Sequence, residues 1–176
     1  LVLWTFHSGD CTRLAEWATS IVSPSETTTF LNFLDSHDGI GLLPVAELLT
    51  AEERHQLVRR TARHGGLVSY RAAGDGTQTP YELNIPWYNA LNDVDSDESD
   101  DIQIARFLAS RAIALALVGV PAIYLPSIVG TYVTSDYKVN ERDPRSINRN
   151  MIRVQALLDQ LSVPESHASR ILEHFV

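Results

Sequence analysis

Two short runs of β-branched and aromatic residues constrain the fold of this 176-residue chain more than any other feature. Residues 28–34 (TTFLNFL) and 120–125 (VPAIYL) each predict a short buried strand followed by a polar or glycine-containing segment. Helical patterns lie between them, and strands that alternate with helices favour right-handed βαβ units and a parallel sheet. Two parallel strands cannot bury both of their faces, so the sheet needs more strands than this chain obviously offers.

The segments around these strands carry clear start and stop signals. Thr50-Ala51-Glu52-Glu53 is a capping box that begins a helix reaching about Arg63, and Gly65-Gly66 supplies its left-handed exit. Residues 72–80 are rich in glycine and polar side chains, which predicts a loop. Asp100-Asp101 places carboxylates at the positive end of another helix, whose apolar second half is expected to be fully buried.

Residues 112–135 contain no charged side chain, and a stretch of that length could span a bilayer. It is interrupted by Gly119, Pro121, Pro126 and Gly130, which break a continuous helix. A helix, a turn, a buried strand and a loop therefore fit this stretch better than a membrane span. We expect no membrane partner.

The formal charge of −8 disfavours a nucleic-acid partner, because phosphate backbones are bound through concentrated Lys and Arg. Six acidic residues fall between Asp93 and Asp101, and without them the charge would be −2. This segment is expected to be a solvated loop; a calcium site is the alternative, although the spacing matches no EF-hand. The single cysteine, Cys11, excludes an intrachain disulfide, and no Cys/His cluster indicates a zinc site. We expect a cytoplasmic protein that needs no cofactor.

The sharpest candidate for chemistry is His37-Asp38-Gly39, which follows the first predicted strand. Polar ligands bind at the carboxyl ends of strands in α/β folds, so an acid and an imidazole at this place could hold one. The alternative is that Asp38 caps a turn and His37 is a core histidine with its ring satisfied. Asp35 lies three residues earlier, but sequence spacing alone does not establish the separation of a working carboxylate pair.

Two further sets of side chains could bind a polar ligand. The first is a cation-bearing loop with Arg142, Arg145 and Arg149. Guanidinium groups suit carboxylates, phosphates and hydroxyls, and the alternative is a solvated surface loop. The second is an aromatic set, Tyr81, Trp87 and Tyr88. These rings could stack on a sugar or form a core cluster beneath a loop.

Four segments together resemble one protein family. FLNFLDSHDGIGLLP (30–44) resembles the region after the seventh barrel strand of sucrose phosphorylases and their relatives, which are glycoside phosphorylases of the α-amylase superfamily. YELNIPWYNAL (81–91) is similar to the family's acceptor and phosphate loop, and ALVGVPAIYLPSIVG (116–130) to its eighth strand. ERDPRSINRN (141–150) is similar to the loop with a sugar-binding arginine. The four occur in the family's order.

This resemblance implies an α/β fold, namely a partial (β/α)₈ TIM barrel with about strands 7 and 8, their helices and an inserted loop region. Residues 1–176 would form the C-terminal part of the catalytic barrel domain. A complete barrel needs roughly 200 residues at minimum, so the chain is too short for one. A partial barrel exposes strand edges and apolar faces, and we therefore expect self-association, for example as a homodimer.

The resemblance also implies roles for single residues. Asp38 would be the catalytic carboxylate that stabilises the transition state, while His37 and Arg149 would bind the glucosyl unit. Tyr81 and Glu82 would line the acceptor and phosphate side. Glu82 stands where sucrose phosphorylases have Gln, and this form looks more like the relatives that act on glucosylglycerate.

The implied reaction is transfer of a glucosyl unit, with retention, from a sucrose- or glucosylglycerate-type α-glucoside to phosphate, which gives glucose 1-phosphate. The partners are thus a small sugar substrate and phosphate. In the family the nucleophilic Asp and the acid/base Glu lie upstream and are absent from this chain, so the chain alone is expected to be inactive. The alternatives are a hydrolase or transglycosylase of the same superfamily and a non-catalytic α/β interaction domain.

Overall fold

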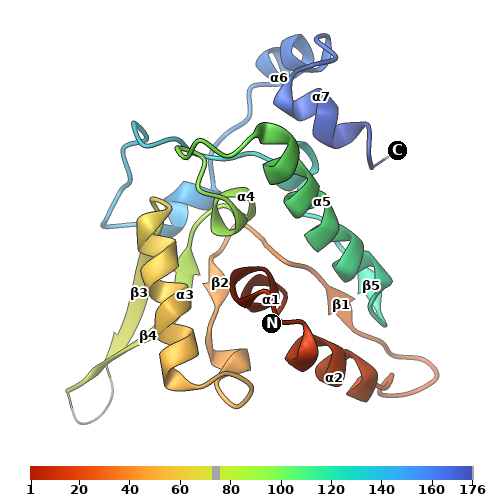
Figure 1. Cartoon of the computed structure of the whole chain (residues 1–176), viewed down its shortest axis with the longest axis vertical. Helices are drawn as coiled ribbons and strands as arrows, with labels where there is room; N and C mark the ends of the chain where they lie inside the picture. The colour runs from red at the N-terminus through yellow and green to blue at the C-terminus, as the bar shows by residue number, and fades with distance from the viewer. Residues whose placement is uncertain (73–75, 176) are drawn as a thin grey trace.

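A computed structural model describes residues 1–72 and 76–175 as a mixed α/β structure (Figure 1). The helices of the described residues are α1 (Val2–Ser8), α2 (Thr12–Ser20), α3 (Ala51–Arg63), α4 (Trp87–Leu91), α5 (Asp100–Ala116), α6 (Val154–Leu161) and α7 (His167–Leu172). Short 3₁₀ helices are η1 (Leu43–Val45), η2 (Leu125–Val129) and η3 (Pro144–Asn148). The strands are β1 (Leu31–Asn32), β2 (Ile40–Gly41), β3 (Leu67–Ala72), β4 (Gln78–Asn84) and β5 (Val120–Pro121).

The strands β1 and β5 pair in parallel, with Leu31 opposite Val120. This pairing confirms the two predicted strands and their direction, although regular pairing covers only two residues of each. The prediction that they are buried is wrong, because Leu31 is 63% exposed and Val120 is 55% exposed. The second half of α5 is not fully buried either, since Leu115 is exposed. A parallel pair needs layers on both faces, and the described residues do not supply them.

The other sheet is antiparallel and has the order β2-β4-β3. Its central strand β4 is well covered: Leu83 is completely buried, and α3 packs against β3 and β4. The predicted loop 72–80 is too long, because Ala72 pairs with Gln78 and Tyr70 pairs with Pro80. Residues 73–75 of that prediction lie outside the described residues. Pairing along β4 thus overrides the loop-forming composition of residues 78–80.

The helix α3 begins at the predicted capping box. The Thr50 side-chain hydroxyl accepts a hydrogen bond from the Glu53 amide at 3.3 Å, and the Glu53 carboxylate accepts one from the Thr50 amide at 2.7 Å. Gly65 follows the helix with a φ of 80°, a left-handed conformation that favours glycine. These signals place the beginning and the end of α3 as the sequence predicted.

The core lies around α1, which packs against α4 and α5 (Figure 1). Val2 and Leu3 of α1, Trp87 and Tyr88 of α4 and Phe107 of α5 are all buried. After Ala116 the charge-free stretch leaves the helix and forms β5 and η2, as its glycine and proline residues predicted. None of the described helices combines the length and apolarity needed to cross a membrane.

Candidate functional site

The turn His37-Asp38-Gly39 lies between β1 and β2, directly against β4. A Cβ atom on Gly39 would lie 2.5 Å from the Leu83 carbonyl oxygen and 2.6 Å from Cγ of Glu82. No larger residue fits at these distances without moving the β4 backbone. This close approach explains the glycine of the motif and places Glu82 beside the turn.

Three cationic or imidazole side chains surround one oxygen of Asp38. Arg149 donates a hydrogen bond from Nη2 to Oδ1 at 2.9 Å, Nη1 of Arg145 lies 3.2 Å from Oδ1, and Nε2 of His37 lies 3.7 Å from it. Arg149 also donates from Nε to the His37 carbonyl at 3.0 Å. No hydrogen bond from the described residues reaches Oδ2. That oxygen is available to accept from a ligand hydroxyl.

Glu82 is held by two groups and is only 6% exposed. Its carboxylate accepts from Nε of Arg145 at 2.8 Å and from Nη2 at 2.6 Å, a bidentate pairing. It also accepts from the Gly39 amide at 3.0 Å. The sequence had indicated Arg145 only as one of three loop cations, because residues 63 positions apart carry no sign of pairing.

These contacts determine the charge state of the turn. Burial raises the pKa of Asp38, but the hydrogen bond from Arg149 and the positive charges of Arg145 and His37 outweigh this effect. The pKa of Asp38 therefore lies below its usual value, and the carboxylate is ionised at neutral pH. The hydrogen bond to Glu82 raises the pKa of Arg145, as do the negative charges of Glu82 and Asp38.

Asp35 has a structural environment that sequence spacing could not reveal. Its carboxylate accepts from Arg111 of α5 at 2.7 and 3.0 Å, and it also accepts from the Ser127 hydroxyl. The Arg111 side chain is only 3% exposed. Arg111 also lies over the Phe107 ring, 4.8 Å from its centre. Asp35 thus ties the end of β1 to α5 and η2, and it does not form a pair with Asp38.

The aromatic set divides between two environments. Trp87 and Tyr88 belong to the core, as the alternative interpretation of these rings proposed. Trp87 donates from its indole nitrogen to the Ser110 hydroxyl at 2.9 Å, and Tyr88 packs against Phe107. Tyr81 is half-buried, and its electrostatic interaction with Arg145 is one of the smaller causes that raise the pKa of Arg145. Trp87 also lines the small pocket beside the turn, whereas Tyr81 interacts with Arg145 of the site.

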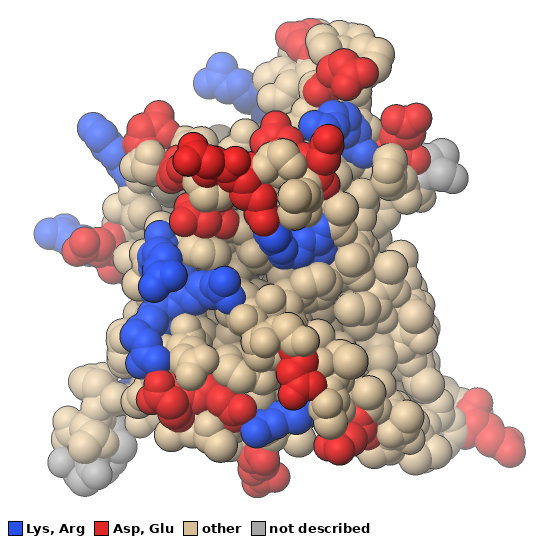
Figure 2. Space-filling model, viewed as in Figure 1, with Lys and Arg blue, Asp and Glu red and all other residues tan. Residues whose placement is uncertain are grey.

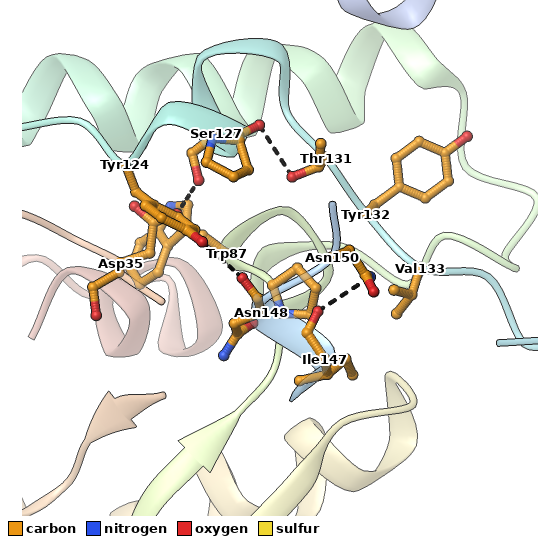
Figure 3. A pocket seen from close by; sticks show the side chains of 13 residues that line it. Asp35, Trp87, Tyr124, Ser127, Thr131, Tyr132, Val133, Ile147, Asn148 and Asn150 are labelled. Carbon is orange, nitrogen blue, oxygen red and sulfur yellow. Dashed lines mark hydrogen bonds between the residues drawn. The ribbon is translucent and has the colours of Figure 1, made fainter. Parts of the chain in front are cut away.

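A small pocket of about 120 Å³ adjoins the turn from the side of β5 (Figure 3). Tyr124 and Asn148 are among its walls, and the Tyr124 hydroxyl donates to the Asn148 carbonyl at 3.0 Å. The side-chain amide of Asn148 donates in turn to the Asp38 carbonyl at 3.0 Å. The loop that holds Arg149 is therefore fixed to both strand ends, at β1 and at β5.

The acidic segment 93–101 lies away from this turn. Figure 2 shows acidic side chains gathered over the connection between α4 and α5. Glu98 pairs with Arg106 at 2.6 Å, and Asp101 pairs with Arg170. In residues 1–72 and 76–175 no group of three or more His, Cys, Asp or Glu side chains is arranged to hold a metal ion.

A much larger apolar groove of about 780 Å³ runs along β1 to the turn. Its walls come mainly from α1, α2, β1 and η1, and they include Asp35 and Gly39 on either side of the turn. Phe30, Leu31 and Phe33 line it and are exposed. The surface beside the candidate site is therefore unusually apolar.

The structure thus gathers the predicted residues His37, Asp38, Tyr81, Glu82 and Arg149 at one place. They come from the turn after β1, from β4 and from the segment after η3. Their roles toward a substrate stay predictions. Arg145 and Asn148 belong to the same network; the sequence had indicated Arg145 as a loop cation, but not its pairing with Asp38 and Glu82.

Comparisons with known proteins identify sequences and a solved structure that are similar to this chain. No protein-family model matches it. It is 44% identical, over 98% of its length, to a glucosylglycerate phosphorylase from Allomeiothermus silvanus and spans 31% of that protein. It is 25% identical, over 93% of its length, to a sucrose phosphorylase from Streptococcus mutans and spans 32% of it. In the solved structures, sucrose 6F-phosphate phosphorylase from Thermoanaerobacter thermosaccharolyticum matches with a TM-score of 0.76 at 18% identity, over 99% of this chain and 32% of that one.

The matches form two groups. Glucosylglycerate phosphorylases are 35% to 44% identical to the chain, and sucrose phosphorylases are 24% to 29% identical. These matches confirm the resemblance drawn from the four sequence segments. The chain corresponds to about 30% of the length of these glycoside phosphorylases, and it has the fold of the corresponding part of the solved structure.

Proposed function

We propose that this chain is one part of a retaining glycoside phosphorylase, which transfers a glucosyl unit from an α-glucoside to phosphate. The observation that carries the proposal is the state of Asp38. It is ionised, held through Oδ1 by Arg149 and Arg145, and free of hydrogen bonds from the described residues at Oδ2. A fixed anion of this kind suits the positive charge that develops on a sugar ring in the transition state.

Each predicted residue then has a role in the proposal. Asp38 accepts glucosyl hydroxyls through Oδ2 and stabilises the transition state. His37 and Arg149 bind the same glucosyl unit, and Tyr81 and Glu82 form the wall on the acceptor and phosphate side. The nucleophilic Asp and the acid/base Glu that retention requires would come from outside this chain. The isolated chain is therefore expected to form no glucose 1-phosphate.

Glucosylglycerate is the substrate we favour. The chain is 44% identical to a glucosylglycerate phosphorylase and 25% identical to a sucrose phosphorylase. In addition, the chain has Glu82 at the position where, by the resemblance, sucrose phosphorylases have Gln. Its pairing with Arg145 removes the cost of an unpaired buried carboxylate next to the turn.

The apolar groove supports the finer assignment of the fold as part of a (β/α)₈ barrel. In this assignment β1 and β5 correspond to strands 7 and 8, and the antiparallel sheet is the inserted loop region. Further strands and helices of a longer protein would cover Phe30, Leu31 and Val120, which are exposed here. Because the lining of the groove includes Gly39, those elements would lie close to the turn with Asp38.

A chimera tests this function. In it, the chain replaces the corresponding 31% of the Allomeiothermus silvanus glucosylglycerate phosphorylase. We expect phosphate-dependent formation of glucose 1-phosphate from glucosylglycerate, and slower formation from sucrose. A folded chimera without activity, measured beside the active parent enzyme, would contradict the proposal.

The same chimera separates the two alternatives. A hydrolase or transglycosylase would release glucose, or transfer it to a sugar, at the same rate without phosphate. A non-catalytic interaction domain would leave the chimera's activity unchanged when Asp38→Asn is introduced. Our proposal requires phosphate dependence and a strong loss with Asp38→Asn.

A further inference from the structure

Arg145 uses all three of its guanidinium nitrogens within the site. Nε and Nη2 donate to the two carboxylate oxygens of Glu82 at 2.8 and 2.6 Å, while Nη1 lies 3.2 Å from Oδ1 of Asp38. Glu82 thus fixes the Nε and Nη2 side of the planar guanidinium group, and the remaining nitrogen, Nη1, is directed at Asp38. A bidentate pairing fixes direction as well as distance.

Glu82 completes a closed ring of contacts. The same Oε1 atom that accepts from Arg145 accepts from the Gly39 amide at 3.0 Å. Gly39 follows Asp38 in the chain, so the ring runs from Asp38 through the backbone to Gly39, then to Glu82, Arg145 and back to Asp38. Because Glu82 is 6% exposed on the central strand of a sheet, the ring has a rigid base.

Arg149 differs from Arg145 in its anchor. It reaches the same Asp38 oxygen, and its other side-chain hydrogen bond among the described residues goes to the His37 carbonyl, which belongs to the turn itself. The side chain of Arg149 thus contacts the turn alone, whereas that of Arg145 connects the turn to β4. Two cations at one oxygen would be redundant if both served only to neutralise charge.

We propose that Arg145 is a positioning residue, which Glu82 holds in a fixed plane so that it orients the Asp38 carboxylate and leaves Oδ2 for the substrate. This inference rests on the proposed function, in which Asp38 meets the glucosyl unit. It assigns Glu82 an action through Arg145 and Gly39 in addition to its place in the wall.

The direct test measures the pKa of Asp38 in the chain by carbon-13 NMR of its carboxyl group. Arg145→Gln removes a positive charge about 3 Å away and should raise this pKa by about 0.5 to 1 pH unit. Glu82→Gln should also raise it, because Arg145 loses its anchor and turns away. Arg142→Gln, at an exposed cation of the same loop, should leave it unchanged.

The Glu82→Gln result decides between positioning and simple charge. If Arg145 stayed in place without Glu82, removal of a nearby negative charge would lower the pKa of Asp38. A lower pKa in Glu82→Gln, or a wild-type pKa in Arg145→Gln, would therefore overturn the proposal. Circular dichroism of each variant shows whether it is folded, and Arg145→Lys provides a milder change that keeps the charge but loses the bidentate pairing.

The chimera supplies a kinetic readout. Arg145→Gln should lower kcat about 10- to 100-fold, as expected when a catalytic group is misplaced, with little change in the KM for phosphate. Arg145→Lys should recover part of that loss. A higher KM for phosphate with unchanged kcat would make Arg145 a phosphate ligand and contradict the positioning role. An inactive wild-type chimera would count against the proposed function, and the NMR titration would then decide the role of Arg145 by itself.

Discussion

The two sheets of this molecule have opposite surroundings. The antiparallel sheet buries its central strand completely at Leu83, while the parallel pair leaves Leu31 and Val120 largely exposed. The candidate site lies where they meet, with Asp35 and Asp38 at the end of β1 and Glu82 on β4. The side of the site formed by β4 is therefore supported by a buried strand, whereas the side formed by β1 lies beside exposed apolar surface.

The two aspartates at this boundary should respond differently to mutation. Asp35→Asn leaves Arg111 as a buried cation with a weakened partner, so we expect it to lower the free energy of unfolding by about 3 to 5 kcal/mol. Urea denaturation measures this change. The exposed pair of Arg59 and Glu52 gives the control, and Glu52→Gln should leave the unfolding midpoint nearly unchanged. Equal effects of the two variants would show that Asp35 does not stabilise the parallel region.

Asp38→Asn should affect activity and spare stability. In the chimera we expect kcat to fall about 10²- to 10³-fold, because the anion that we propose to stabilise transition-state charge is lost. The unfolding midpoint should change little, since the Asp38 side chain is partly exposed and three groups remain around it. A loss of stability as large as that of Asp35→Asn would mean that Asp38 is a structural cap, as the alternative interpretation of the motif held.

The core between the two sheets should weaken in mild acid. Burial lowers the pKa of His7 to about 4, and its Nε2 lies 2.8 Å from the Ala90 carbonyl. The unfolded chain takes up a proton at His7 below about pH 6.5, whereas the folded chain stays neutral down to about pH 4. Stability is therefore full above pH 6.5 and should fall by up to about 3 kcal/mol as the pH drops to 4.

Substitutions can isolate the contribution of His7 to this pH dependence. His7→Gln should make the unfolding free energy less dependent on pH between 6.5 and 4. His55→Gln, at an exposed histidine of α3, should keep the wild-type dependence. The same pH dependence in both variants would exclude His7 as its source.

The glycine at the turn tests how firmly β4 supports the site. Gly39→Ala places a methyl group against the Leu83 carbonyl and should cost about 1 to 3 kcal/mol of stability. Gly41→Ala is the matched control, because its Cβ would lie 3.6 Å from Pro44, an ordinary contact. Thermal unfolding of the two variants compares them. Equal melting temperatures would indicate that the turn can move away from β4.

The smallest expected effect concerns self-association. We predict that the chain associates through the exposed surface of β1 and β5, so Val120→Lys should lower the apparent molar mass in light scattering. Tyr70→Lys changes a residue of similar exposure on β3 of the other sheet and should have no such effect. A wild-type chain that stays monomeric at high concentration would contradict the prediction.

The sequence predicted those features of the fold that depend on a few neighbouring residues. Short patterns of residues predicted the capping box at Thr50 and the parallel direction of β1 and β5. They also predicted that the polar site residues lie in the turn after β1. It did not predict the exposure of Leu31, because an apolar strand pattern reports that a strand should be buried and not whether its covering is present. The pairs Glu82 with Arg145 and Asp35 with Arg111 join distant segments, and only the folded chain reveals them.

The most direct test of the central claim is reconstitution from two pieces. One piece is this chain, and the other is the part of the Allomeiothermus silvanus glucosylglycerate phosphorylase that the chain does not match. Each piece alone should form no glucose 1-phosphate from glucosylglycerate and phosphate, whereas the mixture should form it and lose that activity with Asp38→Asn. Activity in the mixture that is unchanged by Asp38→Asn, or no activity from two pieces that bind each other and are folded, would contradict the claim that this turn belongs to a phosphorylase active site.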